Sequence, residues 1–107
     1  MCDNLITKSK FNAMKSEFDN SIRVKLTTQE TESVWWSIDN LRNYLDEIEE
    51  DGTNDGITVS GVRFYMVANT DTPAERLTLA IRPTSENDAG QKITVENGKI
   101  LNKGLTN

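Results

Sequence analysis

In the middle of this chain the hydrophobic period changes from the spacing of a helix to the spacing of a strand. Between Ile38 and Ile48 apolar residues recur every three or four positions and so share one helix face. Between Val62 and Ala68 apolar residues occupy every second position, which is typical of a strand. More strand-like runs follow without another helix between them. The order therefore predicts an α+β fold with antiparallel strands rather than a parallel β-α-β sheet.

Two helices are predicted before the strands. The first covers about 7–20, where Phe11, Met14 and Phe18 lie on one face and are expected to pack into a core. Residues 23–32 follow, with a short apolar–polar alternation that fits a strand and an extended linker equally well.

The second helix is predicted over about 38–51. Ser37 is its expected N-cap, and Trp36 and Leu41 have the spacing of a hydrophobic staple. Gly52 is expected to end the helix by adopting the left-handed conformation.

Four strands are predicted after the helices, over about 61–68, 77–82, 91–96 and 99–102. In the second of them Ile81 and its apolar neighbours are expected to face the core, Thr78 and Arg82 to face away, and Pro83 to end the strand.

Asn97 and Gly98 lie between the last two strands and predict a two-residue hairpin turn, with Val95 opposite Ile100. Residues 102–107 are expected to fray. The predicted fold is thus two helices followed by an antiparallel meander of about four strands, with a single layer of helix packed on the sheet.

Length and composition limit the chemistry. The 107 residues fit one small domain over 1–107. There is no histidine, and Cys2 is the only cysteine. The chain therefore lacks the commonest acid–base group and metal ligand and cannot form an internal disulfide or a cysteine zinc site. We expect no metal and no cofactor, and we lean away from an enzyme.

The net charge of −5 and a pI near 4.7 argue against nucleic-acid binding, because the twelve Lys and Arg residues form no basic stripe. No apolar run is long enough for a signal peptide or a membrane span. The expected location is the cytoplasm of a bacterial cell.

Carboxylates crowd the end of the second helix, where they oppose the helix dipole; Glu49, Glu50 and Asp51 are the candidate binding residues among them. They would attract a cation or a basic partner, or they would form a solvated helix end. Asp51 to Gly56 resembles the opening of an EF-hand loop, but Val62 stands where the bidentate glutamate belongs, so a turn is expected instead.

A second candidate surface is polar. If the strands pair as predicted, Arg63, Tyr65 and Arg82 point to the same sheet face. Two guanidiniums beside a phenol can hold a carboxylate or phosphate, although a water-covered face or pairing with the acidic helix would equally explain them. Trp35 is a third candidate, either as an exposed interface anchor or as a core aromatic.

The stretch SIDNLRNYLDEI, with GVRFY at 61–65 and LTLAIRPT at 77–84, resembles a loose group of small uncharacterised bacterial proteins. In that group a helix with a YL..I stretch precedes a G-[VI]-R-[IFV]-Y strand, and the next apolar strand ends near proline. The resemblance spans Trp35 to Thr84, about half of the chain. It implies an α+β fold and, because the group has no established activity, no particular site.

These observations favour a non-catalytic protein-interaction module, with a protein partner or a second copy bound at Trp35, Tyr65 and the acidic helix end. The alternative is a small-anion binder or minor enzyme that uses Arg63, Tyr65 and Arg82. Self-association through an exposed strand edge is a third possibility.

Overall fold

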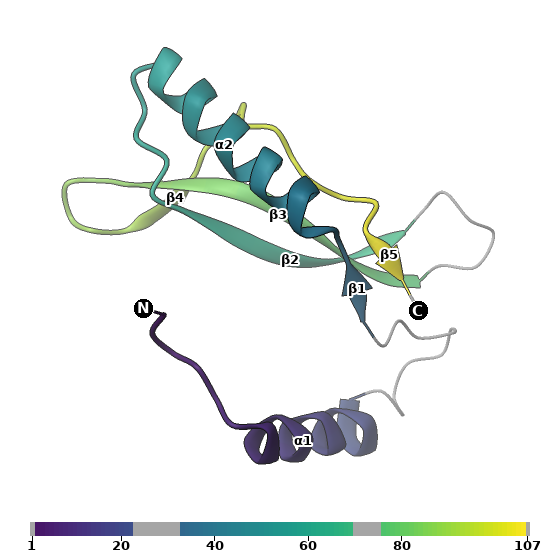
Figure 1. Cartoon of the computed structure of the whole chain (residues 1–107). Coiled ribbons are helices and arrows are strands. Elements are labelled where there is room, and N and C mark those ends of the chain that lie inside the picture. Colours follow the sequence, from purple (N-terminus) through teal and green to yellow (C-terminus); the bar gives the residue numbers. More distant parts are fainter. Residues whose placement is uncertain (1, 23–32, 70–75, 107) are drawn as a thin grey trace. The chain divides into compact units, whose positions relative to one another are not determined.

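The computed structural model describes residues 2–22, 33–69 and 76–106 (Figure 1). Side chains are described over 2–21, 33–67 and 78–104. The chain divides into two compact units, Met1–Glu30 and Thr31–Asn107, each of which is described by itself. One domain over 1–107 stays a prediction, and the strand-or-linker question at 23–32 lies outside the described residues.

The first unit contains α1, Lys8–Glu17, which continues as a π-helical turn, Phe18–Ile22. Thr7 caps the helix, because its side chain accepts a hydrogen bond from the Lys10 amide at 3.0 Å. The prediction of a helix here is confirmed, but its expected core role is wrong for two residues: Phe11 and Met14 are each 53% exposed. No residue of α1 is buried.

The second unit begins with β1, Val34–Trp35, and continues into α2, Ile38–Asn54. Ser37 is the N-cap as predicted, since its hydroxyl accepts a hydrogen bond from the Asn40 amide at 3.0 Å. Trp36 and Leu41, the predicted staple pair, both pack against the hydrophobic core.

The prediction that Gly52 ends α2 is wrong. The helix continues to Asn54, and Gly56 supplies the left-handed residue, with φ 74°. The Ile57 amide donates to the Gly52 carbonyl at 2.7 Å and the Gly56 amide to the Thr53 carbonyl at 3.1 Å, which together form a Schellman cap. Gly52 is needed for close packing instead, because a Cβ there would lie 2.7 Å from the Ile57 oxygen.

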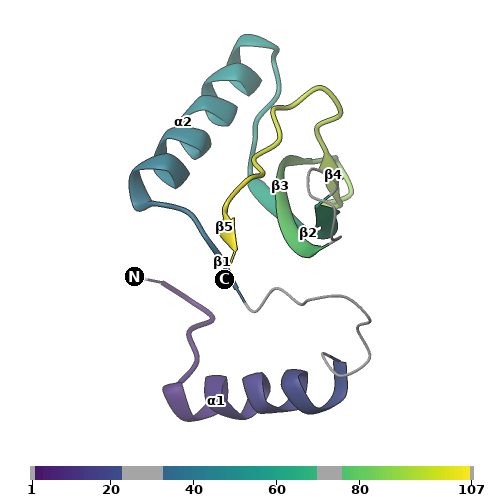
Figure 2. The same cartoon turned by 90° about the vertical axis from the view of Figure 1, so that its right-hand side faces the viewer.

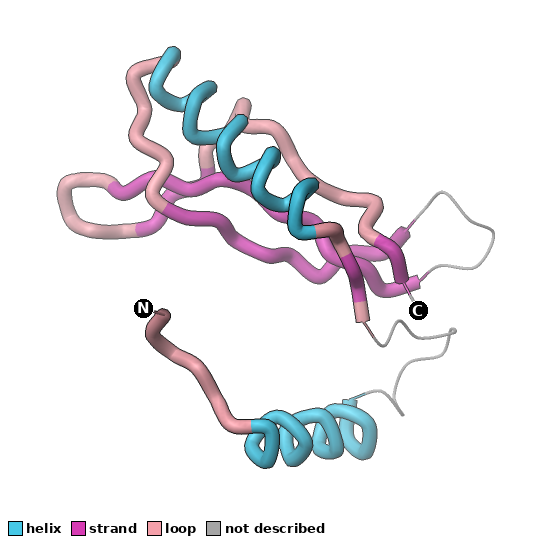
Figure 3. The backbone as a smooth tube through the Cα atoms, in the orientation of Figure 1, coloured by secondary structure: helices cyan, strands magenta, loops and turns pink. Residues whose placement is uncertain are grey.

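The strands confirm an α+β fold with an antiparallel sheet. β2, Gly61–Asn69, pairs with β3, Arg76–Glu86, which pairs with β4, Lys92–Thr94. β1 pairs separately with β5, Leu105–Thr106, so the expected fraying of the tail is wrong at these two residues. Figure 3 shows how short β1, β4 and β5 are beside the long β2–β3 hairpin.

Pro83 does not end β3, which continues for three more residues to Glu86. The Val95 amide donates to the Pro83 carbonyl at 3.0 Å. A regular antiparallel pair would return a bond from residue 83 to the Val95 carbonyl, but proline has no N–H to give. The Gly98 amide donates to that carbonyl instead, at 3.0 Å, and the pairing with β4 stops there.

The predicted hairpin at Asn97 and Gly98 is therefore wrong. The segment 99–102 forms no strand of its own, and it meets β3 again through the bridge between Ile81 and Leu101. Residues 96–100 therefore form a loop between two contacts with the same side of β3. Both flanking segments pair with β3 rather than with each other.

The core of the second unit is small. Among the described residues, the hydrophobic cluster at its centre consists of Tyr44 and Ile48 of α2 and Ile81 of β3, while Thr78, Pro83 and Thr84 of β3 are also buried. The Tyr44 hydroxyl lies 2.9 Å from the Ile81 carbonyl and 2.8 Å from the Lys99 carbonyl, so it links the helix to β3 and to the 99–105 segment. That segment lies alongside α2 in both Figure 1 and Figure 2.

Candidate functional site

The residues predicted as one binding surface are dispersed over the second unit. Trp35 precedes α2, while Glu49, Glu50 and Asp51 lie in its last turns. A helix of 17 residues is about 25 Å long, so these two groups lie near opposite ends of α2. Tyr65 lies on β2 of the sheet. These residues therefore do not form one contiguous cluster.

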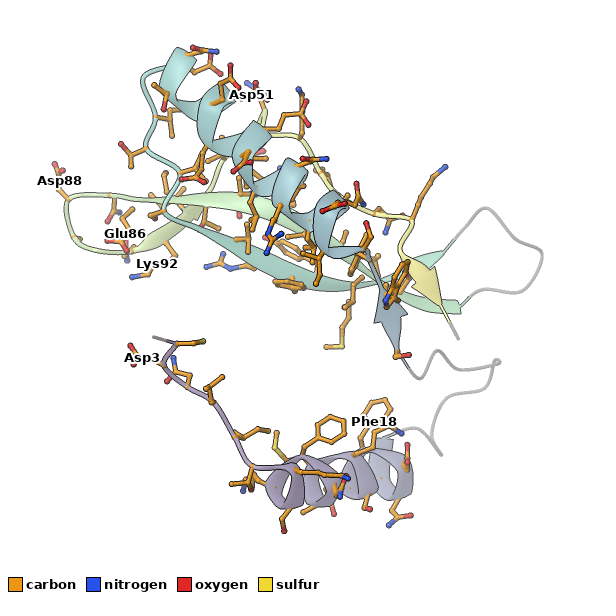
Figure 4. The ribbon with its side chains drawn as sticks, in the orientation of Figure 1. Asp3, Phe18, Asp51, Glu86, Asp88 and Lys92 are labelled. Carbon is orange, nitrogen blue, oxygen red and sulfur yellow. The ribbon has the colours of Figure 1, made fainter. Side chains whose placement is uncertain are left out.

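The acidic helix end is neutralised in part by Lys99. Its Nζ lies 2.7 Å from a Glu47 carboxylate oxygen and 3.2 Å from one of Asp51. Glu47 and then Asp51 raise the pKa of Lys99 through these hydrogen bonds. Figure 4 labels Asp51 on this face of α2. Glu47 and Asp51 thus have a structural partner that sequence reasoning missed, because Lys99 is 48 positions away from Asp51.

No metal site is found in the described part of the chain. The stretch that resembles an EF-hand opening forms the last turn and cap of α2 instead. Within residues 2–22, 33–69 and 76–106, no group of three or more His, Cys, Asp or Glu side chains could hold a metal ion.

Arg63, Tyr65 and Arg82 do lie on one sheet face. Arg63 and Arg82 are directly opposite each other on β2 and β3. The Tyr65 hydroxyl is 3.1 Å from Thr94 Oγ1, and this hydrogen bond, with smaller contributions from the two arginines, lowers the pKa of Tyr65. The three side chains are therefore close neighbours, as predicted.

Each arginine of this face is already engaged with the backbone. Arg63 Nη2 donates to the Lys92 carbonyl at 3.3 Å, and Arg82 Nη2 donates to the Glu96 carbonyl at 3.2 Å. Among the described residues, Nε of Arg82 is buried and has no hydrogen-bond partner. Like charges directly opposite each other destabilise a strand pair, so an anion between the two guanidiniums would be favourable.

Two concavities are described, and neither is lined by Arg63, Tyr65 or Arg82. A groove of about 760 Å³ lies between the end of α2, the 55–59 loop and the 94–99 segment. A smaller one of about 210 Å³ lies between α2 and the start of β2. Neither groove therefore provides a pocket in which Arg63, Tyr65 and Arg82 could hold a buried anion.

Among the described side chains of the three-stranded sheet, the most exposed large apolar ones lie on β2, where sequence reasoning named no site. Phe64 is 55% exposed and Met66 is 75% exposed. Within the described residues β2 is an edge strand, because it pairs with β3 and with no other strand. Alternating apolar residues indicated the strand, but no local signal distinguishes an edge from a central strand.

The backbone of β2 has hydrogen-bonding groups along this edge that no described residue pairs with. The Ile81 amide donates to the Leu101 carbonyl, so odd-numbered residues of β3 point toward β4 and even-numbered ones toward β2. From the register, the odd-numbered residues of β2 then face β3. The amides and carbonyls that face outward are those of Val62, Phe64, Met66 and Ala68.

Comparison with known proteins gave no relative: no family model, no curated protein and no solved structure matches this chain significantly. Within the described residues, no helix has the length and apolar character that crossing a membrane would require.

Proposed function

We propose that this protein is a non-catalytic protein-interaction module that binds an extended polypeptide segment along the outer edge of β2. The observation that carries the proposal is the open edge itself. Over its nine residues β2 turns the backbone groups of every second residue outward, where no described residue pairs with them, and it exposes two apolar side chains, Phe64 and Met66. An added strand would pair with these groups, which is a common way to recognise a peptide.

The composition of β2 supports this use. Natural edge strands are usually shortened or blocked by proline, lysine or a bulge. The stretch from Val62 to Val67 contains none of these residues and has one charge, Arg63, which points to the other face and donates to Lys92. An edge of this length and apolar character is prone to unwanted pairing unless a partner covers it.

The sequence supports a binding role over catalysis, because histidine and a recognisable nucleophile motif are both missing. The proposal also includes a single layer formed by α2 on the sheet, for which the Tyr44 hydrogen bond and the core cluster are the support. A cytoplasmic location in a bacterial cell is part of the same proposal.

Selection from a displayed library of random peptides tests the binding role. We expect the wild type to enrich extended peptides that Met66→Pro no longer binds, because proline removes an outward N–H without removing a bond to β3. Ile93→Lys is the matched control, since Ile93 is 46% exposed but lies on β4. No enrichment by the monomeric protein, or enrichment that Met66→Pro leaves intact, would refute the proposal.

Small-anion binding is the second candidate, favoured by one observation: Arg63 faces Arg82, and neither forms an ion pair among the described residues. Sulfate or phosphate held between the two guanidiniums would relieve their repulsion and raise the melting temperature. Arg82→Gln should abolish that increase, and Arg42→Gln, at an exposed position of α2, should leave it unchanged. An equal response in all three proteins excludes the site.

A further inference from the structure

We infer that the strand that completes the β2 edge is β2 of a second copy of this chain, so that two sheets join into one across a two-fold axis. The inference rests on the proposed function and names its partner. The register of β2, the side chains that the pairing would bring together and the charges along the edge all favour a second copy.

The outward-facing positions of β2 are self-complementary in an antiparallel pair. β2 runs from Gly61 to Asn69, so its central residue is Tyr65. With the two-fold axis at Tyr65, Phe64 of one copy lies opposite Met66 of the other, and Val62 lies opposite Ala68. All four residues have outward amides and carbonyls, which gives about eight hydrogen bonds between the copies. This register uses the full length of the strand.

The same register places exposed apolar side chains against one another. Phe64 and Met66 share the face that carries Ile81. Across the axis Phe64 of each copy would contact Met66 of the other, which gives two such contacts. Pairs between a methionine sulfur and an aromatic ring are favourable. On the other face Tyr65 lies opposite Tyr65 of the second copy, and aromatic pairs stabilise neighbouring strands.

Charge also favours a second copy at this edge. The protein has a net charge of −5, so most surfaces of two copies repel. No acidic residue occurs between Gly61 and Asn69. Arg63 would lie opposite Val67, and the two copies of Arg63 would be about 13 Å apart along the strands, beyond strong repulsion. Closed two-fold pairs are the commonest arrangement of identical chains.

Light scattering over a range of concentrations tests the pairing with the full chain. We expect the wild type to form dimers and Met66→Lys to remain monomeric, because two lysines would be placed within an apolar contact. Ile38→Lys is the matched control: Ile38 is 67% exposed and lies on α2, so this variant should form dimers like the wild type. Circular dichroism verifies that each variant is folded.

Disulfide formation tests the register in a Cys2→Ser background. Tyr65→Cys should form an interchain disulfide readily, because directly opposite residues that are not hydrogen-bonded lie about 4.5 Å apart at Cα. Arg63→Cys alone should not, whereas mixing it with Val67→Cys should give the crosslinked pair. Equal crosslinking of the Arg63→Cys and Tyr65→Cys variants, each on its own, would overturn the register.

The failure of this inference can be separated from that of the proposed function. A monomeric wild type at all concentrations, or dimers that persist in Met66→Lys, would overturn the pairing of two β2 strands. If a monomeric wild type still selects peptides in a manner that Met66→Pro abolishes, the edge binds a different protein. If it selects none, the proposed function falls as well.

Discussion

At the scale of single residues, the two tyrosines show how tertiary surroundings give one side-chain type opposite roles. Tyr44 is buried in the core, and its hydroxyl lies between the carbonyls of Ile81 and Lys99. Burial is the main cause that raises the pKa of Tyr44. The pKa of Tyr65 is lowered, mainly by its hydrogen bond with Thr94. The sequence indicates part of this difference, because Tyr44 lies in the apolar stripe of its helix and Tyr65 on the polar face of its strand. The hydrogen-bond partners of the two hydroxyls depend on the tertiary structure.

The two tyrosines should therefore titrate separately, with Tyr65 losing its proton at a lower pH than Tyr44. Because the folded pKa of Tyr44 is raised, its contribution to stability is present below the pKa of an unfolded tyrosine, near 10. That contribution is lost as the pH rises toward the folded pKa. Carbon NMR of the tyrosine rings measures both transitions. Tyr65→Phe should remove the earlier one and Tyr44→Phe the later one; the reverse assignment would contradict this interpretation.

At the scale of elements, the largest difference between expectation and structure concerns the path after β3. Asn97 and Gly98 have the composition of a hairpin turn, yet β4 and Leu101 both pair with β3. Two residues explain why no hairpin forms. Pro83 interrupts the pairing of β3 with β4 at Val95, and Gly98 packs against the Pro83 ring. A proline in a strand indicates a defect in pairing, but its consequence depends on which strand lies beside it.

Gly98→Ala should lower the free energy of unfolding by about 1–3 kcal/mol, the usual cost of overfilling a packed site. A Cβ at this position would be 3.2 Å from Pro83 Cδ and from the Val95 oxygen. Gly61→Ala is the control, since its Cβ would meet only Thr84 Oγ1, at 3.3 Å. Urea unfolding gives both values.

The same measurement on Gly98→Ala in a Pro83→Ala background isolates the contact between the two residues. Removing the ring should recover most of the loss caused by the Gly98 substitution. If the loss is unchanged without the ring, packing against Pro83 is not its cause.

At the scale of the whole molecule, one basic side chain, Lys99, connects the C-terminal region of this acidic protein to α2. Lys99 connects the 95–104 segment to α2 by pairing with Glu47 and Asp51. All three side chains are well exposed, so the attraction is screened by salt. Because the pKa of Lys99 is raised, this contribution is present below about pH 10 and is lost as the pH rises through the folded pKa.

Lys99→Gln should lower the melting temperature in dilute buffer, and the difference from the wild type should shrink as sodium chloride is added. Lys10→Gln changes the net charge equally but removes no ion pair among the described residues, so it serves as the control. Thermal unfolding monitored by circular dichroism gives both values. A deficit for Lys99→Gln that persists at high salt would indicate a packing role for the side chain instead.

The sequence alone determined the local structure wherever the signal is carried by neighbouring residues. The apolar spacing of α2, the Ser37 cap and the alternation in β2 each depend on a few adjacent side chains, so each was predictable. The same holds for the shared face of Arg63, Tyr65 and Arg82, which follows once β2 and β3 pair.

Tertiary structure decided what depends on residues far apart in the sequence. The pairing of β1 with β5, the partner of Lys99 and the close approach that requires Gly52 all join segments whose proximity no local pattern encodes. Above all, the position of β2 at the edge of the sheet is set by the whole strand order. A strand pattern specifies which side chains share a face, but which backbone groups remain unpaired depends on every other strand.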